Sequence, residues 1–185
     1  MAETPSTMLP LGTIAPNFHL NDVTTNKIIS LQELKSPKAT IIMFICNHCP
    51  YVKHIQKKLV EVAKKYQAQG MHFVAINSND AKNYLADSPE NMKIEADKLG
   101  YPFPYLFDET QEVAKAYHAA CTPDFFVFDN NLSCIYRGRF DGATPGNNTP
   151  VTGVELSNAL DCILANTDIT TDQKPSLGCN IKWKK

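Results

Sequence analysis

The sequence lacks several features that would assign it to large classes of protein. No apolar run approaches the ~18 residues that a membrane-spanning helix needs. The formal net charge is −1, so the chain has no cationic excess with which to bind nucleic acid or an anionic membrane surface. The N-terminal segment has neither the basic region nor the apolar stretch of a signal peptide. We therefore expect a cytoplasmic protein that binds neither nucleic acid nor membrane.

The cysteines lack the context of a secreted disulfide framework, although the chain has six of them: Cys46, Cys49, Cys121, Cys134, Cys162 and Cys179. In a reducing compartment they are expected to form one redox or metal site plus buried thiols. A second Cys-x-x-Cys or His-x-x-His pair, which most zinc cages need, is missing. A metal–thiolate site, in which Cys121, Cys179 or His48 would complete the Cys46–Cys49 pair, stays open as an alternative.

The most informative motif is the Cys-x-x-Cys pair, Cys46 and Cys49, which lies between two contrasting segments. The apolar run 39–45 predicts a strand covered on both faces. Pro50 suits the first turn of a helix, and apolar residues then recur at helical spacing: Val52, Ile55, Leu59, Val62, Ala63 and Tyr66. We expect Cys46 at the solvent end of this turn, its thiolate stabilised by the free amides and dipole of the helix, with Cys49 one helical turn deeper.

The remaining patterns predict an α/β protein with the order β-α-β-α-β-α-β-β-α. A parallel βαβ half followed by an antiparallel pair predicts a sheet with helices on both faces. A hairpin over 18–30 precedes the first long strand. The expected strands are 39–45, 71–76, 103–107, 125–128 and 134–137, and the expected helices are 50–69, 89–99, 110–118 and 153–166. In the helix 110–118, Thr110 is the expected cap, with Val113, Ala116 and Tyr117 facing inward.

Three segments resemble the thioredoxin-like group related to the alkyl hydroperoxide reductase/thiol-specific antioxidant family. The segment 12–20 is similar to the family's Gly-x-x-Ala-Pro-x-Phe-x-Leu entry, and Cys46–Cys49 stands where the thioredoxin redox pair stands. The segment 122–129 resembles the family's cis-proline strand. The resemblance covers nearly the whole chain and implies a thioredoxin-like fold: a central mixed sheet, helices on both faces and an N-terminal β-hairpin extension.

The resemblance also divides the chain and implies a feature at the site. We expect a thioredoxin-like domain over 1–166, with the N-terminal extension in 1–35, and a C-terminal tail, 167–185, packed on that domain. The Thr122–Pro123 peptide is implied to be cis and to pack against the redox pair. In the family, the backbone before this proline hydrogen-bonds an incoming polypeptide or thiol.

The function implied is thiol–disulfide exchange. Cys46 would attack a substrate disulfide as the thiolate, and Cys49 would resolve the mixed disulfide. His48 departs from the Gly-Pro dipeptide of thioredoxins and is expected to stabilise the Cys46 thiolate and raise the reduction potential. No cofactor is needed. The expected substrate is a disulfide-bearing protein or small thiol, the expected electron donor is a dithiol protein or glutathione, and edge strands leave a homodimer open.

Two other functions stay open. A thiol peroxidase would use Cys49, because Cys49-Pro50 echoes the Cys-Pro of peroxiredoxins, or Cys46. Against it, Cys46 stands where those enzymes have an activating threonine. A peptide-binding module would use the groove beside Pro123 without turnover.

The other cysteines divide into two pairs. Cys121 lies two residues before Pro123 and is either a third redox thiol or a packing residue. Cys179 lies near the only tryptophan, Trp183, and is a candidate resolving thiol. Cys134 and Cys162 are expected to be core residues.

Overall fold

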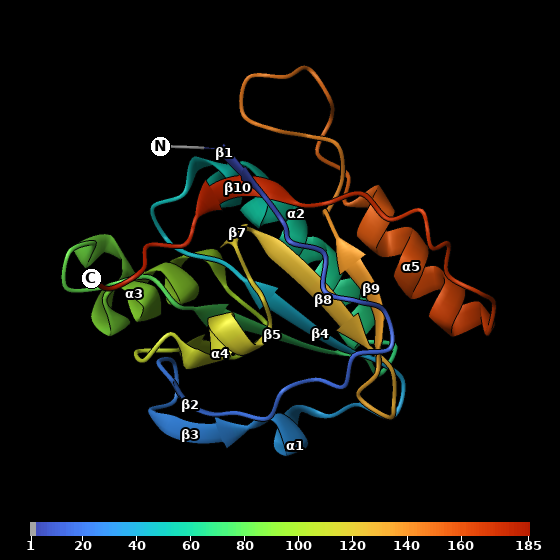
Figure 1. Cartoon of the computed structure of the whole chain (residues 1–185), viewed down its shortest axis with the longest axis horizontal. Helices are drawn as coiled ribbons and strands as arrows, with labels where there is room; N and C mark the ends of the chain where they lie inside the picture. The colour runs from blue at the N-terminus through green and yellow to red at the C-terminus, as the bar shows by residue number, and fades with distance from the viewer. Residues whose placement is uncertain (1–2) are drawn as a thin grey trace.

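A mixed sheet forms the centre of the computed structural model, which describes residues 3–185. In the described chain its strand order is β3-β2-β6-β5-β4-β8-β9. Strands β4, β5 and β6 are parallel, and the other neighbours pair antiparallel, which confirms the predicted mixed sheet (Figure 1). The strands are β2 (His19–Asp22), β3 (Lys27–Ser30), β4 (Thr40–Phe44), β5 (His72–Asn77), β6 (Tyr105–Phe107), β8 (Asp124–Phe128) and β9 (Cys134–Gly138).

Helices cover both faces of this sheet. The helical elements are α1 (Leu31–Leu34), α2 (Pro50–Gln67), the 3₁₀ turn η1 (Leu85–Asp87), α3 (Pro89–Leu99), α4 (Glu112–Ala116) and α5 (Val154–Ala165). Ile41 and Met43 of β4 pack in the core beneath α2, α3 and α5, whereas Ile42 and Phe44 pack with α1 and α4 on the other face. Both sets are buried because successive side chains of a strand alternate between faces. Within residues 3–185, no helix combines the length and apolar character needed to cross a membrane.

A second, small sheet joins the two ends of the chain. Its order is β1-β10-β7, and all pairs are antiparallel. The strands are β1 (Glu3–Pro5), β10 (Leu177–Asn180) and β7 (Cys121–Thr122). Figure 1 shows β1 and β10 side by side near the start of α2. Sequence patterns predicted none of these strands, because each is short and only their pairing makes them recognisable. The boundary at residue 166 stays a prediction.

The expected details of α4 are wrong in two respects. The helix is preceded by Gln111, in the left-handed conformation at φ 66°, and Thr110 is not its cap. The Asp108 carboxylate accepts the amide of Ala114 at 2.9 Å, and so it meets one of the free amides of the first turn. Ala114 is buried, whereas Ala116 is exposed, so Ala114 and not Ala116 faces inward.

Three smaller expectations also need correction. Helix α2 ends at Gln67, and Gly70, at φ 88°, forms the turn into β5 instead of ending the helix directly. Strand β6 begins only at Tyr105, because Pro104 has no amide hydrogen to donate to a ladder. Cys162 is half-buried on α5 and is not a core residue, whereas Cys134 is buried as expected.

Candidate dithiol site

Cys46 and Cys49 lie in the short turn between β4 and α2. Cys49 is the residue that caps the N-terminus of α2, and Pro50 occupies the first helical position as predicted. Both thiols are enclosed, with 2% of Cys46 and 0% of Cys49 exposed. The expectation that the helix amides stabilise a Cys46 thiolate is wrong, because the pKa of Cys46 is raised, while its place at the solvent end of the turn stays a prediction. The amide of Val52, in the first turn, points at Cys49 instead.

The two thiols have opposite electrostatic environments. A hydrogen bond from the Cys46 thiol lowers the pKa of Cys49 to about 5 against the effect of burial, and further bonds from Cys179 and from the Val52 amide act in the same direction. Burial raises the pKa of Cys46 well above its ordinary value, and its hydrogen bond to Cys49 raises it further. The pair therefore shares a proton, which stays on Cys46, and the negative charge collects on Cys49.

Thr122 contacts both sulfurs from the far side of the site. Its Oγ1 lies 3.3 Å from Cys46 Sγ, and its carbonyl oxygen lies 3.1 Å from Cys49 Sγ. The carbonyl accepts a hydrogen bond only from a protonated thiol, so it opposes a Cys49 thiolate. The donors around Cys49 outweigh this single acceptor. The Thr122–Pro123 peptide is cis, which confirms the geometry that the resemblance implied.

His48 lies beside Cys46 and is held by a buried carboxylate. Its Nδ1 is 2.5 Å from Oδ2 of Asp87, and its ring stacks on Tyr84 with centroids 5.3 Å apart. Within residues 3–185, its buried Nε2 has no hydrogen-bond partner. The Cys46 sulfur, a His48 nitrogen and an Asp87 oxygen all lie within 4.8 Å of one another. A nucleophile, a base and a group that orients the base thus lie together.

Asp87 is the functional residue that the sequence reasoning missed. It is fully buried in η1, and it accepts hydrogen bonds from the amide of Asn47 at 2.7 Å and from the side chain of Asn79 at 2.9 Å. Although burial raises its pKa, the bonds from His48 and Asn79 lower it below the ordinary value, so Asp87 is charged. Nothing in the sequence around residue 87 indicates this role, because the redox turn that it contacts, with Asn47 and His48, lies about 40 residues earlier.

The remaining predicted thiols lie close to the pair. Cys179, on β10, is buried and hydrogen-bonded to Cys49, and burial followed by this contact raises its pKa to about 12. Cys121 is buried at the start of β7, where its Sγ lies 3.7 Å from the carbonyl oxygen of Pro123. Burial raises the pKa of Cys121 far above the ordinary value, and whether it is a third redox thiol or a packing residue stays a prediction.

A metal ion could take Cys46, His48 and Asp87 as ligands only at a cost. Their donor atoms are close enough, but His48 and Asp87 are already hydrogen-bonded to each other. An ion would have to break that bond and neutralise the Cys46 thiol. The arrangement is therefore better suited to moving a proton than to holding an ion.

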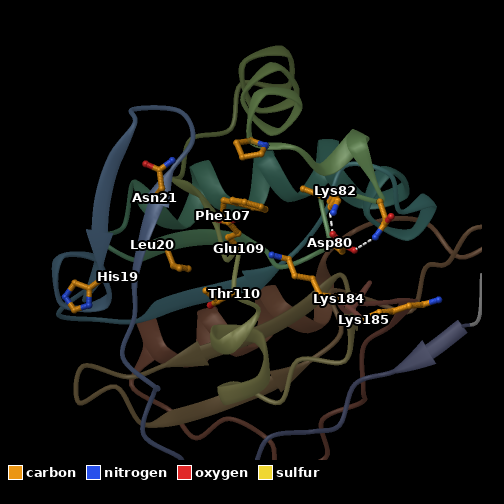
Figure 2. Close-up of a pocket in the computed structure, with 13 residues that line it drawn as sticks. His19, Leu20, Asn21, Asp80, Lys82, Phe107, Glu109, Thr110, Lys184 and Lys185 are labelled. Carbon is orange, nitrogen blue, oxygen red and sulfur yellow. Dashed lines mark hydrogen bonds between the residues drawn. The ribbon is translucent and has the colours of Figure 1, made fainter.

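A wide groove on the surface lies away from the thiols. Figure 2 shows this groove, of about 1010 Å³, between the β2–β3 hairpin, the 80–83 loop and the C-terminal lysines. Its lining includes Lys82, Lys184 and Lys185 but no cysteine. The groove therefore contributes no thiol to the dithiol site.

Comparison with known proteins decides the family. A family model described as AhpC/TSA matches residues 11–136, which include both site cysteines and Pro123. The chain belongs to the AhpC/TSA family. The predicted resemblance is thus confirmed. The matched region ends at β9, so α5 and β10, with Cys179, lie outside it.

Several individual proteins are also similar to this chain. It is 26% identical to the thiol-disulfide oxidoreductase ResA of Geobacillus thermodenitrificans over 128 residues, 69% of this chain and 68% of that protein. The crystal structure of an uncharacterized conserved protein from Geobacillus kaustophilus superposes with a TM-score of 0.98 at 57% identity, over 100% and 97% of the chains. A putative thioredoxin from Neisseria meningitidis, 21% identical, has a TM-score of 0.63 over 83% and 91% of the chains, which shows the shared fold.

Proposed function

We propose that the protein is a thiol–disulfide oxidoreductase that uses Cys46 and Cys49. The observation that carries this proposal is the buried Cys46-x-x-Cys49 pair at the start of α2, with both sulfurs against Thr122 of the cis peptide; the lowered pKa of Cys49 and the raised pKa of Cys46 agree with it. The spacing of two residues at a helix start is that of a redox dithiol, and the ionised thiol, Cys49, is the one that resolves the mixed disulfide. The name of the ResA relatives supports the same reaction.

In the proposed reaction, Cys46 attacks the substrate disulfide. Its proton must leave first, and the nearby His48 imidazole is the acceptor, with the charged Asp87 stabilising the imidazolium that forms. The attack breaks the substrate S–S bond and releases one substrate thiolate, which takes up the proton. Cys49 then attacks Cys46 Sγ, releases the second substrate thiolate and forms the Cys46–Cys49 disulfide. A dithiol protein or glutathione, the electron donor of the proposal, restores the reduced pair.

Insulin-disulfide reduction tests this proposal with wild type, Cys46→Ser and Cys49→Ser. We expect turnover to be lost in Cys46→Ser, and Cys49→Ser to accumulate a mixed disulfide on Cys46. If Cys46→Ser kept the wild-type rate, the proposed nucleophile would be wrong. Cys134→Ser is the matched control, because Cys134 is buried in β9 and has no contact with the site that the mechanism uses.

Peroxide reduction is the second candidate, and one observation favours it. The lowered pKa of Cys49, directly before Pro50, is the property that a peroxidatic cysteine needs. Hydrogen-peroxide consumption by the same variants separates the two functions. Turnover that survives Cys46→Ser and is lost in Cys49→Ser would identify a peroxidase.

The cellular location and the oligomeric state are part of the same proposal. A cytoplasmic location and a possible homodimer stay predictions, which cell fractionation and analytical ultracentrifugation check. The substrate class, a disulfide-bearing protein or small thiol, follows from the proposed reaction alone.

A further inference from the structure

The C-terminal strap, residues 176–185, covers the backbone beside the cis peptide. Its strand β10 pairs antiparallel with β7, and Cys179 lies opposite Thr122 in the register. Further bonds hold the strap in place: the Ile181 amide donates to Ala120 at 3.1 Å, and the Lys182 amide donates to Asn79 at 2.8 Å. The chain's own C-terminal strand therefore occupies the edge next to the dithiol (Figure 1).

The approach of the strap to this edge is unusually close. A Cβ added at Gly178 would lie 2.0 Å from the carbonyl oxygen of Thr122. Only glycine allows the two backbones to meet at this distance, since the obstructing atom belongs to backbone and cannot rotate away. The contact brings the neighbouring side chain of Cys179 against the dithiol.

The sulfur of Cys49 interacts with the thiols of both Cys46 and Cys179. It is hydrogen-bonded to Cys46 on its own turn and to Cys179 on the strap. All three residues are buried in the same core cluster. The sulfur of Cys49 therefore lies between two possible disulfide partners, one on its own turn and one on the strap.

We propose that Cys179 is a third redox thiol, which takes over the disulfide from Cys46. This inference rests on the proposed function, which supplies the Cys46–Cys49 disulfide. The Cys179 sulfur attacks Cys49 Sγ, the Cys46–Cys49 bond breaks, and the Cys49–Cys179 bond forms. Cys46 leaves as a thiolate and receives the proton that Cys179 gives up, so one disulfide replaces another without a further oxidant.

The exchange has two consequences. Cys46 becomes a free thiol again while the oxidising equivalent is stored between α2 and β10. The strap is also joined covalently to the start of α2, which fixes it over the Thr122 backbone. Reduction of the Cys49–Cys179 bond releases the strap from this covalent link.

Disulfide mapping after oxidation by one equivalent of oxidised glutathione tests the proposal. Trypsin leaves Cys46 and Cys49 within the single peptide 39–53, whereas Cys179 lies in the peptide 140–182. A Cys46–Cys49 bond stays within one peptide, and a Cys49–Cys179 bond joins two. Cys162 shares the second peptide, so the experiment is done in a Cys162→Ser background, with free thiols alkylated in acid before digestion.

We expect the joined peptides in this background and in the further variant Cys46→Ser, but not in Cys179→Ser. In the oxidised parent protein, Cys46 is expected to be alkylated in the molecules that hold the joined peptides. If the bond within 39–53 forms and Cys179 is alkylated in every molecule, this inference is overturned and the proposed function stands. If neither bond forms, both are overturned.

A second variant keeps the test independent of the cysteines. In Gly178→Ala the added methyl forces β10 away from Thr122, so the joined peptides are expected to disappear while the bond within 39–53 still forms. Fluorescence of Trp183, the single tryptophan, reports the displaced strap. Gly142→Ala is the control, because its Cβ meets no atom closer than 3.5 Å. If the fluorescence shows a displaced strap in Gly178→Ala and the yield of joined peptides is unchanged, the inference is contradicted.

Discussion

Cys49 and Cys134 are both buried, yet the structure gives them opposite chemistry. Cys134, on β9, is 1% exposed, and burial raises its pKa to about 11. Cys49 is 0% exposed, but the thiols of Cys46 and Cys179 and the amide of Val52 surround its sulfur, and its pKa falls to about 5. Burial alone makes a thiol inert, and burial among hydrogen-bond donors makes it acidic.

Two buried carboxylates repeat this contrast. Asp87 receives hydrogen bonds from His48, Asn47 and Asn79, and its pKa is lowered. Asp124, on β8, is fully buried, and within residues 3–185 neither of its oxygens has a well-formed hydrogen bond. Burial raises its pKa to about 7, which the nearby serine hydroxyls only partly offset. A thiol and a carboxyl group at the dithiol site, Cys49 and Asp87, therefore have lowered pKa values, whereas the buried Cys134 and Asp124 have raised ones.

The largest expected effect comes from removing the donor to Cys49. In Cys46→Ala, disulfide turnover is expected to fall more than ~10³-fold, because the attacking thiol is lost. The pKa of Cys49 is expected to rise, because its strongest hydrogen-bond donor is gone. Thiolate absorbance at 240 nm, titrated against pH, checks this. Cys134→Ala should change neither the turnover nor the pKa of Cys49. If Cys134→Ala and Cys46→Ala changed them equally, the contrast between Cys49 and Cys134 would be contradicted.

The second effect is on stability and concerns Asp124. Its folded pKa is raised, so the folded protein binds more protons than the unfolded chain between about pH 4 and pH 7. Its contribution is fully present below about pH 4 and is lost as pH rises through about 7, a loss on the order of 4 kcal/mol. Urea unfolding from pH 4 to 8 measures it.

Asp124→Asn is the matched variant, and it should remove this part of the pH dependence. The difference between the two curves isolates the carboxyl group from all other titrating groups. Parallel curves would show that Asp124 is not protonated in the folded protein.

The smallest of the three effects concerns proton transfer by His48. His48→Ala is expected to slow disulfide exchange ~10²-fold at neutral pH, since Cys46 loses its proton acceptor. The loss should shrink as pH rises, because hydroxide then removes the proton. Asp87→Asn is expected to slow exchange ~10-fold, because the base keeps its place but loses the charge behind it. A rate loss independent of pH would indicate a structural role only.

Local patterns in the sequence were sufficient for most of the fold. The apolar run before Cys46 has few alternatives to a buried strand, and Pro50 marks the helix start whatever lies elsewhere. The AhpC/TSA membership followed from motifs that are contiguous in the chain, and the cis peptide at Pro123 was implied by the resemblance to that family. Short elements such as β7 and β10 were missed, because their strands exist only through pairing with distant residues.

The sequence by itself determined that a Cys-x-x-Cys pair precedes an amphipathic helix in a mixed α/β sheet. Only the tertiary structure decided which sulfur is acidic, since that depends on donors from Val52 and Cys179. It also placed Asp87 behind His48 and set Gly178 against Thr122, across separations that no local pattern encodes. The reason is physical: a secondary structure depends on neighbours along the chain, whereas a pKa depends on neighbours in space.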